Sequence, residues 1–316
     1  MRCRNLHLRK WGTEDRMMAR HGQFAWYELL TTDMAAAKAF YTSILGWVAA
    51  DASTPKFAYS VFTTNQAPVC GLMDLPLEGR KMGATPRWVG YVAVDDVDSS
   101  VDQLKRLGGA VYVPPTDTNI GRISIIADPQ RATFALAQNL TYQQPTELDG
   151  RGRVGWRELL ASDWKTAFPF YSALFGWQRA QTDIDSTASY QMLLADGDPI
   201  GGVFTKLAVA PFPFWLYYFN VPDIAAAAKL VTAGGGRIAQ GPTAMAGGNW
   251  IVRCIDPQGA MFALRAAANQ GGVMEVSDAE LAWSTSWGEF ASHGRLVAKP
   301  APKPGGSSKS KSAPKR

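Results

Sequence analysis

Two acidic residues with the potential to do chemistry, Glu28 and Glu158, lie in aromatic and apolar segments, each two positions after a tryptophan. Each also lies five residues before an aspartate. A carboxylate surrounded by aromatic side chains loses hydration, which raises its pKa. Such a group can serve as a general acid or base, or it can anchor a ligand amine or hydroxyl. These two glutamates are therefore the candidate catalytic residues.

The segments that hold the two glutamates are copies of each other. Residues 26–47 and 156–177 align without a gap at an offset of 130, and 10 of their 22 positions are identical. A repeat of this length indicates an internal duplication. A weaker repeat follows at an offset of 127, and in each copy it places a tyrosine five residues before an aspartate: Tyr91 and Tyr218.

Each copy of the long repeat predicts a strand followed by a helix, after which the chain turns back. In the first copy, residues 26–32 are compatible with a strand, and Asp33 can cap the helix that follows. Apolar residues then recur at a spacing of three to four and give the helix one apolar face, which Gly46 ends. In the second copy, Pro169 lies several residues into the helix, and we expect it to kink the helix or to delay its start.

The whole pattern predicts four βαβββ modules in an α+β fold, with two modules in each half. Short strand-like runs follow each helix, and each half closes on an Asp-Pro-Gln sequence within a predicted strand. The predicted domains are a disordered N-terminal extension over 1–21, a first domain over 22–141, a linker over 142–152, a second domain over 153–268, a C-terminal extension over 269–298 and a basic disordered tail over 299–316.

This organisation resembles the vicinal oxygen chelate superfamily, which includes glyoxalase I, bleomycin-resistance proteins, fosfomycin-resistance enzymes and extradiol dioxygenases. The matching segments are FYTSILGW and FYSALFGW, and later IIADPQ and CIDPQG. The resemblance is nearest to the two-domain members called glyoxalase/bleomycin resistance protein-like. It implies two half-barrel domains, each a cupped sheet with a concave face that holds the site.

Metal-dependent members of that family carry a histidine seven residues before the module's aspartate and a glutamate on the last strand. The corresponding residues here are Trp26, Val89, Trp156, Leu216, Ala135 and Ala263. The three histidines, His7, His21 and His293, lie outside the modules. We therefore predict no metal site of the family type and no cofactor, while a divalent ion held by carboxylates stays open.

The same family positions predict what lines each cup. Side chains alternate along a strand, so the residue five before the aspartate shares a face with the residue seven before it. Glu28 and Tyr91 then face the first cup, and Glu158 and Tyr218 face the second. The predicted ligand-binding residues are Trp26, Tyr91, Trp156 and Tyr218. Each glutamate either bonds its tyrosine and ties two modules together, anchors a ligand, or takes part in catalysis.

The positive charge is concentrated at the two ends of the chain. The net charge is +5, yet the last 18 residues hold six basic residues and no acid, and residues 21–298 carry a net charge of −5. A tail rich in lysine, proline, glycine and serine cannot bury enough apolar surface to fold. We expect it to be solvated, with weak contact to nucleic acid or another polyanion as the alternative.

Other features of the composition limit the compartment and the partners. The three cysteines are widely spaced and predict neither a disulfide framework nor a zinc site, which favours the reducing cytoplasm. No apolar run approaches the roughly 20 residues that span a bilayer, so no membrane partner is expected. The Arg-rich N-terminal segment lacks the apolar stretch that a secretory signal contains. Two complete halves favour a monomer.

The sequence therefore predicts a protein that binds a small organic molecule in an aromatic cup without the family's metal. The alternative is a glyoxalase-like lyase or isomerase that uses Glu28 or Glu158 as acid and base, or as carboxylate ligands of a metal. A third hypothesis is an interaction protein whose basic tail binds a polyanion. Whether each cup is built from neighbouring or exchanged modules stays open.

Overall fold

The computed structural model describes most of the two predicted domains. The described residues are 19–55, 57–81, 83–142, 150–180, 190–206, 210, 212–245 and 248–267. The predicted C-terminal extension and basic tail lie outside them, as do residues 1–18 of the N-terminal extension and residues 143–149 of the linker.

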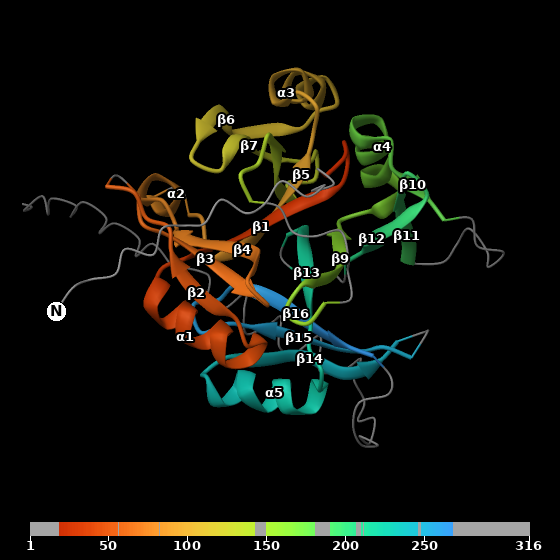
Figure 1. Cartoon of the computed structure of the whole chain (residues 1–316). Coiled ribbons are helices and arrows are strands. Elements are labelled where there is room, and N and C mark those ends of the chain that lie inside the picture. Colours follow the sequence, from red (N-terminus) through yellow and green to blue (C-terminus); the bar gives the residue numbers. More distant parts are fainter. Residues whose placement is uncertain are drawn as a thin grey trace, which may run out of the picture.

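The first half forms one eight-stranded mixed sheet in the order β2-β3-β4-β1-β5-β8-β7-β6 (Figure 1). Its strands are β1 (Phe24–Thr31), β2 (Val48–Asp51), β3 (Tyr59–Thr64), β4 (Ala67–Asp74), β5 (Arg87–Ala93), β6 (Ala110–Thr118), β7 (Gly121–Ala127) and β8 (Thr133–Gln138). Its helices are α1 (Met34–Leu45), α2 (Leu77–Lys81) and α3 (Val97–Arg106).

The second half repeats this sheet in the order β10-β11-β12-β9-β13-β16-β15-β14. Its strands are β9 (Val154–Ala161), β10 (Gln178–Arg179), β11 (Tyr190–Ala195), β12 (Asp198–Thr205), β13 (Phe214–Asn220), β14 (Arg237–Ala244), β15 (Trp250–Ile255) and β16 (Met261–Ala266). Its helices are α4 (Trp164–Phe175) and α5 (Ile224–Ala233). The predicted α+β class with repeated βαβββ modules is confirmed.

The predicted helix boundaries follow from local capping. The Asp33 side chain accepts a hydrogen bond from the Ala36 amide, and Gly46 ends α1 in the left-handed conformation at φ 69°. In the second copy, α4 begins directly after its cap, Asp163, so the predicted delay at Pro169 is wrong. Asp163 bonds the Lys165 amide and starts the helix a full turn before the proline.

The Asp-Pro-Gln sequences form turns between strands, which corrects the prediction that they lie within strands. β7 ends at Ala127 and β8 begins at Thr133. The Asp128 carboxylate accepts hydrogen bonds from the amides of Gln130 and Ala132, each at 2.9 Å. Proline has no amide hydrogen for a sheet ladder, and the aspartate side chain stabilises the turn that replaces it.

Neighbouring modules build each sheet, which settles the pairing that the sequence left open. β1 and β5 pair antiparallel within the first sheet, and β9 and β13 pair in the same way within the second. The helices pack differently, because α1 lies against α5 and α3 lies against α4 (Figure 1). Each half therefore supplies its own sheet but shares its helical layer with the other half.

Two equivalent hydrogen-bond chains join the halves. The Tyr41 hydroxyl on α1 donates to Asp256 at 3.0 Å and accepts from the Trp88 indole at 3.0 Å. In the second half, the hydroxyl of the corresponding residue, Tyr171, donates to Asp128, also at 3.0 Å. Each tyrosine comes from the FY pair of the repeat, and each aspartate from the Asp-Pro-Gln turn of the other half.

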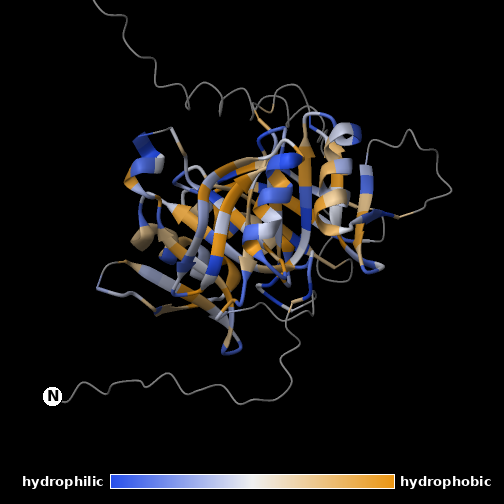
Figure 2. Cartoon of the chain, turned by 90° about the horizontal axis from the view of Figure 1, so that it is seen from above, coloured by the Kyte–Doolittle hydropathy of each residue, from blue (hydrophilic) through white to orange (hydrophobic). Residues whose placement is uncertain are grey.

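Each sheet has two different faces. The back face carries Tyr27, Leu29 and Trp88, which belong to one large core shared by both halves. The front face of the first half carries Trp26 and Tyr91 in a separate cluster. Figure 2 shows the hydrophobic parts of the strands running through the middle of the molecule. Among the described residues, no helix is long and apolar enough to cross a membrane.

We expect Tyr41→Phe to lower the free energy of unfolding by about 1–3 kcal/mol, because it removes a hydroxyl that serves two buried polar groups. Urea unfolding followed by circular dichroism measures the change. Tyr112→Phe is the matched control, because Tyr112 is 49% exposed. Equal stability of the two variants would contradict a role for Tyr41 in joining the halves.

Candidate small-molecule site

The predicted pair of Glu28 and Tyr91 meets on the front face of the first sheet. Glu28 lies on the central strand β1 and is 2% exposed. The Tyr91 hydroxyl on β5 donates to one carboxylate oxygen of Glu28. The Tyr59 hydroxyl on β3 donates to the other oxygen at 2.5 Å. The glutamate thus joins strands of both modules, which is the tethering role that the sequence left open.

A glycine allows the second tyrosine to reach the glutamate. β4 lies between β3 and β1, and Gly71 on β4 stands directly beside Glu28 in the parallel ladder. The Tyr59 ring crosses above Gly71, where a Cβ atom would lie 2.0 Å from the hydroxyl oxygen. The second half repeats this arrangement with Tyr190 and Gly202, at 2.1 Å. Any larger residue at either glycine would block the tyrosine.

Burial changes the acidity of the first glutamate. Desolvation raises the pKa of Glu28, and the hydrogen bonds from Tyr59 and Tyr91 oppose only part of that increase. Desolvation also raises the pKa of both tyrosines, which keeps their hydroxyls protonated as donors. The front face of the first half therefore holds a carboxyl group that ionises less readily than an exposed glutamate.

The second half places an ion pair at the corresponding position. Glu158 is 2% exposed and accepts a hydrogen bond from Tyr218, which is one of the alternatives that the sequence left open. It also accepts one from the Arg253 guanidinium at 2.7 Å, and the two residues form a buried ion pair. Arg253 in turn donates to the Tyr218 hydroxyl at 2.7 Å and to the Gln240 side-chain oxygen at 2.5 Å.

The two predicted tryptophans occupy equivalent places but differ in exposure. The Trp26 indole donates to Tyr59 at 3.2 Å, and the Trp156 indole donates to Tyr190 at 2.8 Å. Trp26 is fully buried, whereas Trp156 is only half-buried. The structure thus brings each predicted glutamate, tyrosine and tryptophan onto one front face in both halves. Whether these residues bind a ligand stays a prediction.

Sequence reasoning missed four members of these networks: Tyr59, Tyr190, Gln240 and Arg253. The tyrosines had a detectable signal, because each precedes a glycine of the repeat by 12 residues, Gly71 in one copy and Gly202 in the other. Arg253 had none, because it stands next to a cysteine in an apolar strand and has no charged counterpart in the first copy.

The residues present do not fit the family's metal. Its ligand positions hold Trp26, Val89 and Ala135, which meet on adjacent strands of the front face but offer no oxygen or nitrogen acceptor to a cation. The oxygens of Glu28 already accept two hydroxyl hydrogens, and Arg253 places a positive charge beside Glu158. No group of three or more potential ligands occurs among the described residues.

A separate cavity of about 500 Å³ lies beside α2. Its lining includes Phe57, Met73, Leu77 and Arg80, but none of the predicted site residues. The predicted residues therefore lie on the sheet faces and not in this cavity.

The chain belongs to the Glyoxalase/Bleomycin resistance protein/Dioxygenase superfamily, whose family model matches residues 23–136 and 153–264. It is 34% identical over 254 residues to a protein of Mycobacterium tuberculosis, CFP32, which is named as a proposed glyoxylase. That match covers 79% of this chain and 97% of CFP32. It is 28% identical to the anthracycline biosynthesis protein DnrV of Streptomyces peucetius, over 77% of this chain and 92% of DnrV.

Solved structures support the fold. The Mn(II)-bound glyoxalase of Novosphingobium aromaticivorans aligns with a TM-score of 0.54 and 15% identity, over 79% of this chain and 84% of that one. Homoprotocatechuate 2,3-dioxygenase of Brevibacterium fuscum aligns with a TM-score of 0.56 and 14% identity, over 83% and 84% of the two chains. At such low identities the likeness concerns the fold alone.

We expect Glu28→Gln to become more stable relative to the wild type as the pH rises. A carboxyl whose folded pKa is raised stabilises the fold fully below its ordinary pKa of 4.5 and loses that contribution as the pH rises through the folded value. Glutamine does not titrate, so the difference between the two proteins should grow from about pH 4.5 upward. Urea unfolding at several pH values measures it.

The matched control is Glu78→Gln, because Glu78 lies exposed on α2. Its stability difference from the wild type should not follow the trend of Glu28→Gln. A Glu28→Gln variant that loses stability relative to the wild type as the pH rises would show that Glu28 is held in its ionised form.

Proposed function

We propose that the chain binds a small aromatic organic molecule on the front face of its sheets, without a metal of the family type. The proposal rests on the residues that line the front face of the second half. There, half-buried Trp156, Tyr190 and Phe204 surround the buried pair of Glu158 and Arg253. Aromatic side chains offer stacking surfaces, and a few fixed polar groups orient a ligand between them.

The relatives support the choice of an aromatic ligand. DnrV is named for anthracycline biosynthesis, and an anthracycline contains a planar anthraquinone ring system. Anthracyclines also fluoresce, which makes them convenient probes. We therefore take a fluorescent anthracycline as the first test ligand for the proposed site.

We expect the wild-type protein to bind that anthracycline and Trp156→Leu to bind it about tenfold more weakly, because one aromatic stacking partner is lost. Fluorescence titration measures both affinities. Trp250→Leu is the matched control, since Trp250 is also half-buried but packs on the shared core of the back face. Equal weakening in both variants would argue for general destabilisation instead of a site at Trp156.

The absence of a family-type metal is a separate proposal with its own test. Because the residues at the family's ligand positions carry no suitable donors, we expect purified protein to hold far less than one equivalent of Mn, Fe, Ni or Zn. Elemental analysis by mass spectrometry, after dialysis without a chelator, measures the content. One tightly held equivalent of any of these metals would overturn this proposal.

A glyoxalase-like lyase or isomerase is the second candidate, and the raised pKa of Glu28 favours it. A carboxyl that titrates nearer to neutral pH is suited to proton transfer. Against that role, both oxygens of Glu28 are bonded to tyrosines and the side chain is 2% exposed. Turnover of a bound ligand that falls in Glu28→Gln or Glu158→Gln would favour an enzyme over a binding protein.

The third hypothesis concerns residues 299–316, which lie outside the described residues. If this basic segment binds a polyanion, deleting it should reduce the affinity for nucleic acid and leave the stability of the protein unchanged. An unchanged affinity would remove the segment from that role.

A further inference from the structure

The two halves carry different side chains at equivalent positions of the front face. In the first half, Val113 on β6 pairs with Ile125 on β7. In the second half, the equivalent pair is Gln240 on β14 and Arg253 on β15. An apolar pair in one copy thus corresponds to an amide and a guanidinium in the other, next to a glutamate that both copies retain.

The guanidinium is held in one orientation. Arg253 bonds Glu158, Tyr218 and Gln240, and its guanidinium carbon lies 5.7 Å from the centre of the Phe204 ring. Burial by itself would lower the pKa of Arg253, but Tyr218 and Glu158 outweigh that effect and raise it. Arg253 is therefore a fixed positive charge on an aromatic surface, with a carboxylate directly beside it.

The fold does not require this ion pair. The first half forms the equivalent eight-stranded sheet with Ile125 at the position of Arg253, and there the glutamate is bonded by the hydroxyls of Tyr59 and Tyr91. Removing two charges from water is costly, and apolar residues often stabilise such a position as well or better. The comparison of the two halves points to a role for the Glu158–Arg253 ion pair other than stabilising the fold.

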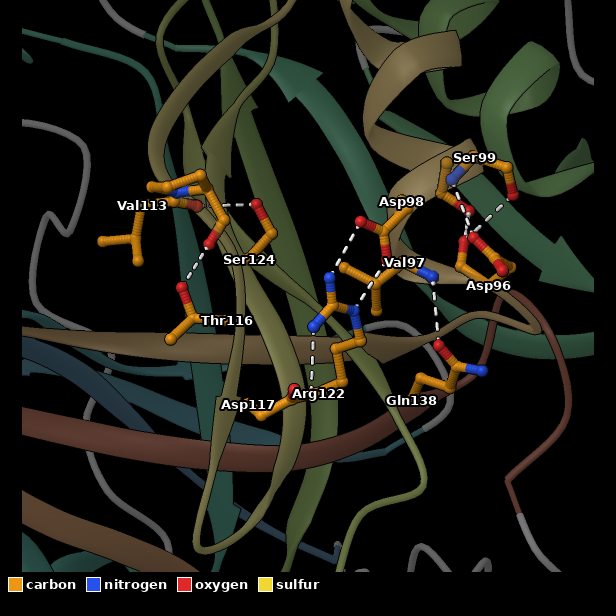
Figure 3. A network of polar contacts seen from close by, with 12 residues as sticks. Asp96, Val97, Asp98, Ser99, Val113, Thr116, Asp117, Arg122, Ser124 and Gln138 are labelled. Carbon is orange, nitrogen blue, oxygen red and sulfur yellow. Dashed lines mark hydrogen bonds and ion pairs between the residues drawn. The ribbon is translucent and has the colours of Figure 1, made fainter.

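The first half is also closed more tightly. Trp26, Tyr59 and Tyr91 are exposed by at most 2%, whereas Trp156 and Tyr190 remain half-buried. In the first half, Arg122 at the end of the β6–β7 hairpin bonds Asp98 on α3 at 2.6 and 2.8 Å and Asp117 at 3.0 Å (Figure 3).

The second half lacks the residues for that fastening. The register places Trp250 where Arg122 stands and Ala244 where Asp117 stands, and the equivalent of Asp98 at the start of α5 is Ala225. The hairpin of the second half is thus not tied to its helix by these ion pairs. Of the two differences, the greater exposure of Trp156 and Tyr190 favours the second front face as the one that a ligand can enter.

We propose that the second half is the ligand-binding half, and that its ligand is a neutral aromatic molecule with a hydroxyl group next to a carbonyl group. Such a ligand donates its hydroxyl hydrogen to Glu158 and accepts a hydrogen bond from Arg253 through its carbonyl oxygen. The aromatic ring then lies against Trp156 and Phe204. This inference rests on the proposed function and names its half and its ligand class.

The test compares 2-acetyl-1-naphthol with 2-acetylnaphthalene, which has the same ring system but no hydroxyl. We expect the wild-type protein to bind the naphthol at least about tenfold more tightly, because only the naphthol can add a hydrogen bond from its own hydroxyl to the charged Glu158 carboxylate. Isothermal titration calorimetry of the full chain measures both affinities. The double variant Glu158→Gln/Arg253→Met, which removes both charges together, should bind the two compounds equally.

The matched control is Ile125→Met, the equivalent position of the first half, and it should keep the wild-type preference for the naphthol. Thermal unfolding confirms that each variant is folded. If the double variant is not folded, Glu158→Gln alone replaces it in the test. Binding of neither compound by the wild type overturns the proposed function. Binding without a preference, or a preference that the Glu158 and Arg253 variants retain, overturns only the present inference.

Discussion

The hydroxyl of Tyr41 crosses the boundary between the two halves to reach the buried carboxylate of Asp256, and Tyr171 does the same toward Asp128. Each aspartate also organises the turn between the last two strands of its own sheet. The turn between two inner strands of each sheet is therefore tied to a helix from the other half. Desolvation raises the pKa of both aspartates, so these bonds lie where an unpartnered polar group would be most costly.

The tryptophans that end the repeated segments strengthen this boundary. The Trp47 indole donates to the Gly152 carbonyl at 2.8 Å, and the Trp177 indole donates to the Gly22 carbonyl at 2.7 Å. Each indole thus holds the chain just before the first strand of the opposite half. The motif that made the duplication visible in the sequence is, in the structure, the set of contacts between the duplicated halves.

The residues at the pseudo-twofold axis have diverged for a physical reason. Equivalent positions meet there: the Arg157 guanidinium donates to the Tyr27 hydroxyl at 2.6 Å, and the Gly90 amide donates to the Tyr217 hydroxyl at 2.8 Å. Two arginines would repel each other at such a site, and a Cβ on Gly90 would lie 2.6 Å from the Tyr217 oxygen. A single chain with two copies permits unlike partners, which identical subunits on a true twofold axis do not.

Much of the fold was predictable from local signals. Asp33 and Gly46 mark a helix by their capping chemistry, and the two glutamates share a face with Tyr91 and Tyr218 because side chains alternate along strands. The turn at Asp128 was harder, because a hairpin with apolar strands on both sides reads as one long strand. The start of α4 was misjudged because the cap at Asp163 acts before Pro169 is reached.

The sequence by itself determined the duplication and the βαβββ order, because these depend on residues close together in the chain. The alternation of side chains along strands then placed a glutamate and a tyrosine on each front face. Only the tertiary structure decided that Glu28 lies in a closed network with two tyrosines while Glu158 lies beside a cation. That difference depends on Arg253, which is 95 residues from Glu158. Charge and burial at a site are set by neighbours across strands, and a strand's own sequence does not contain them.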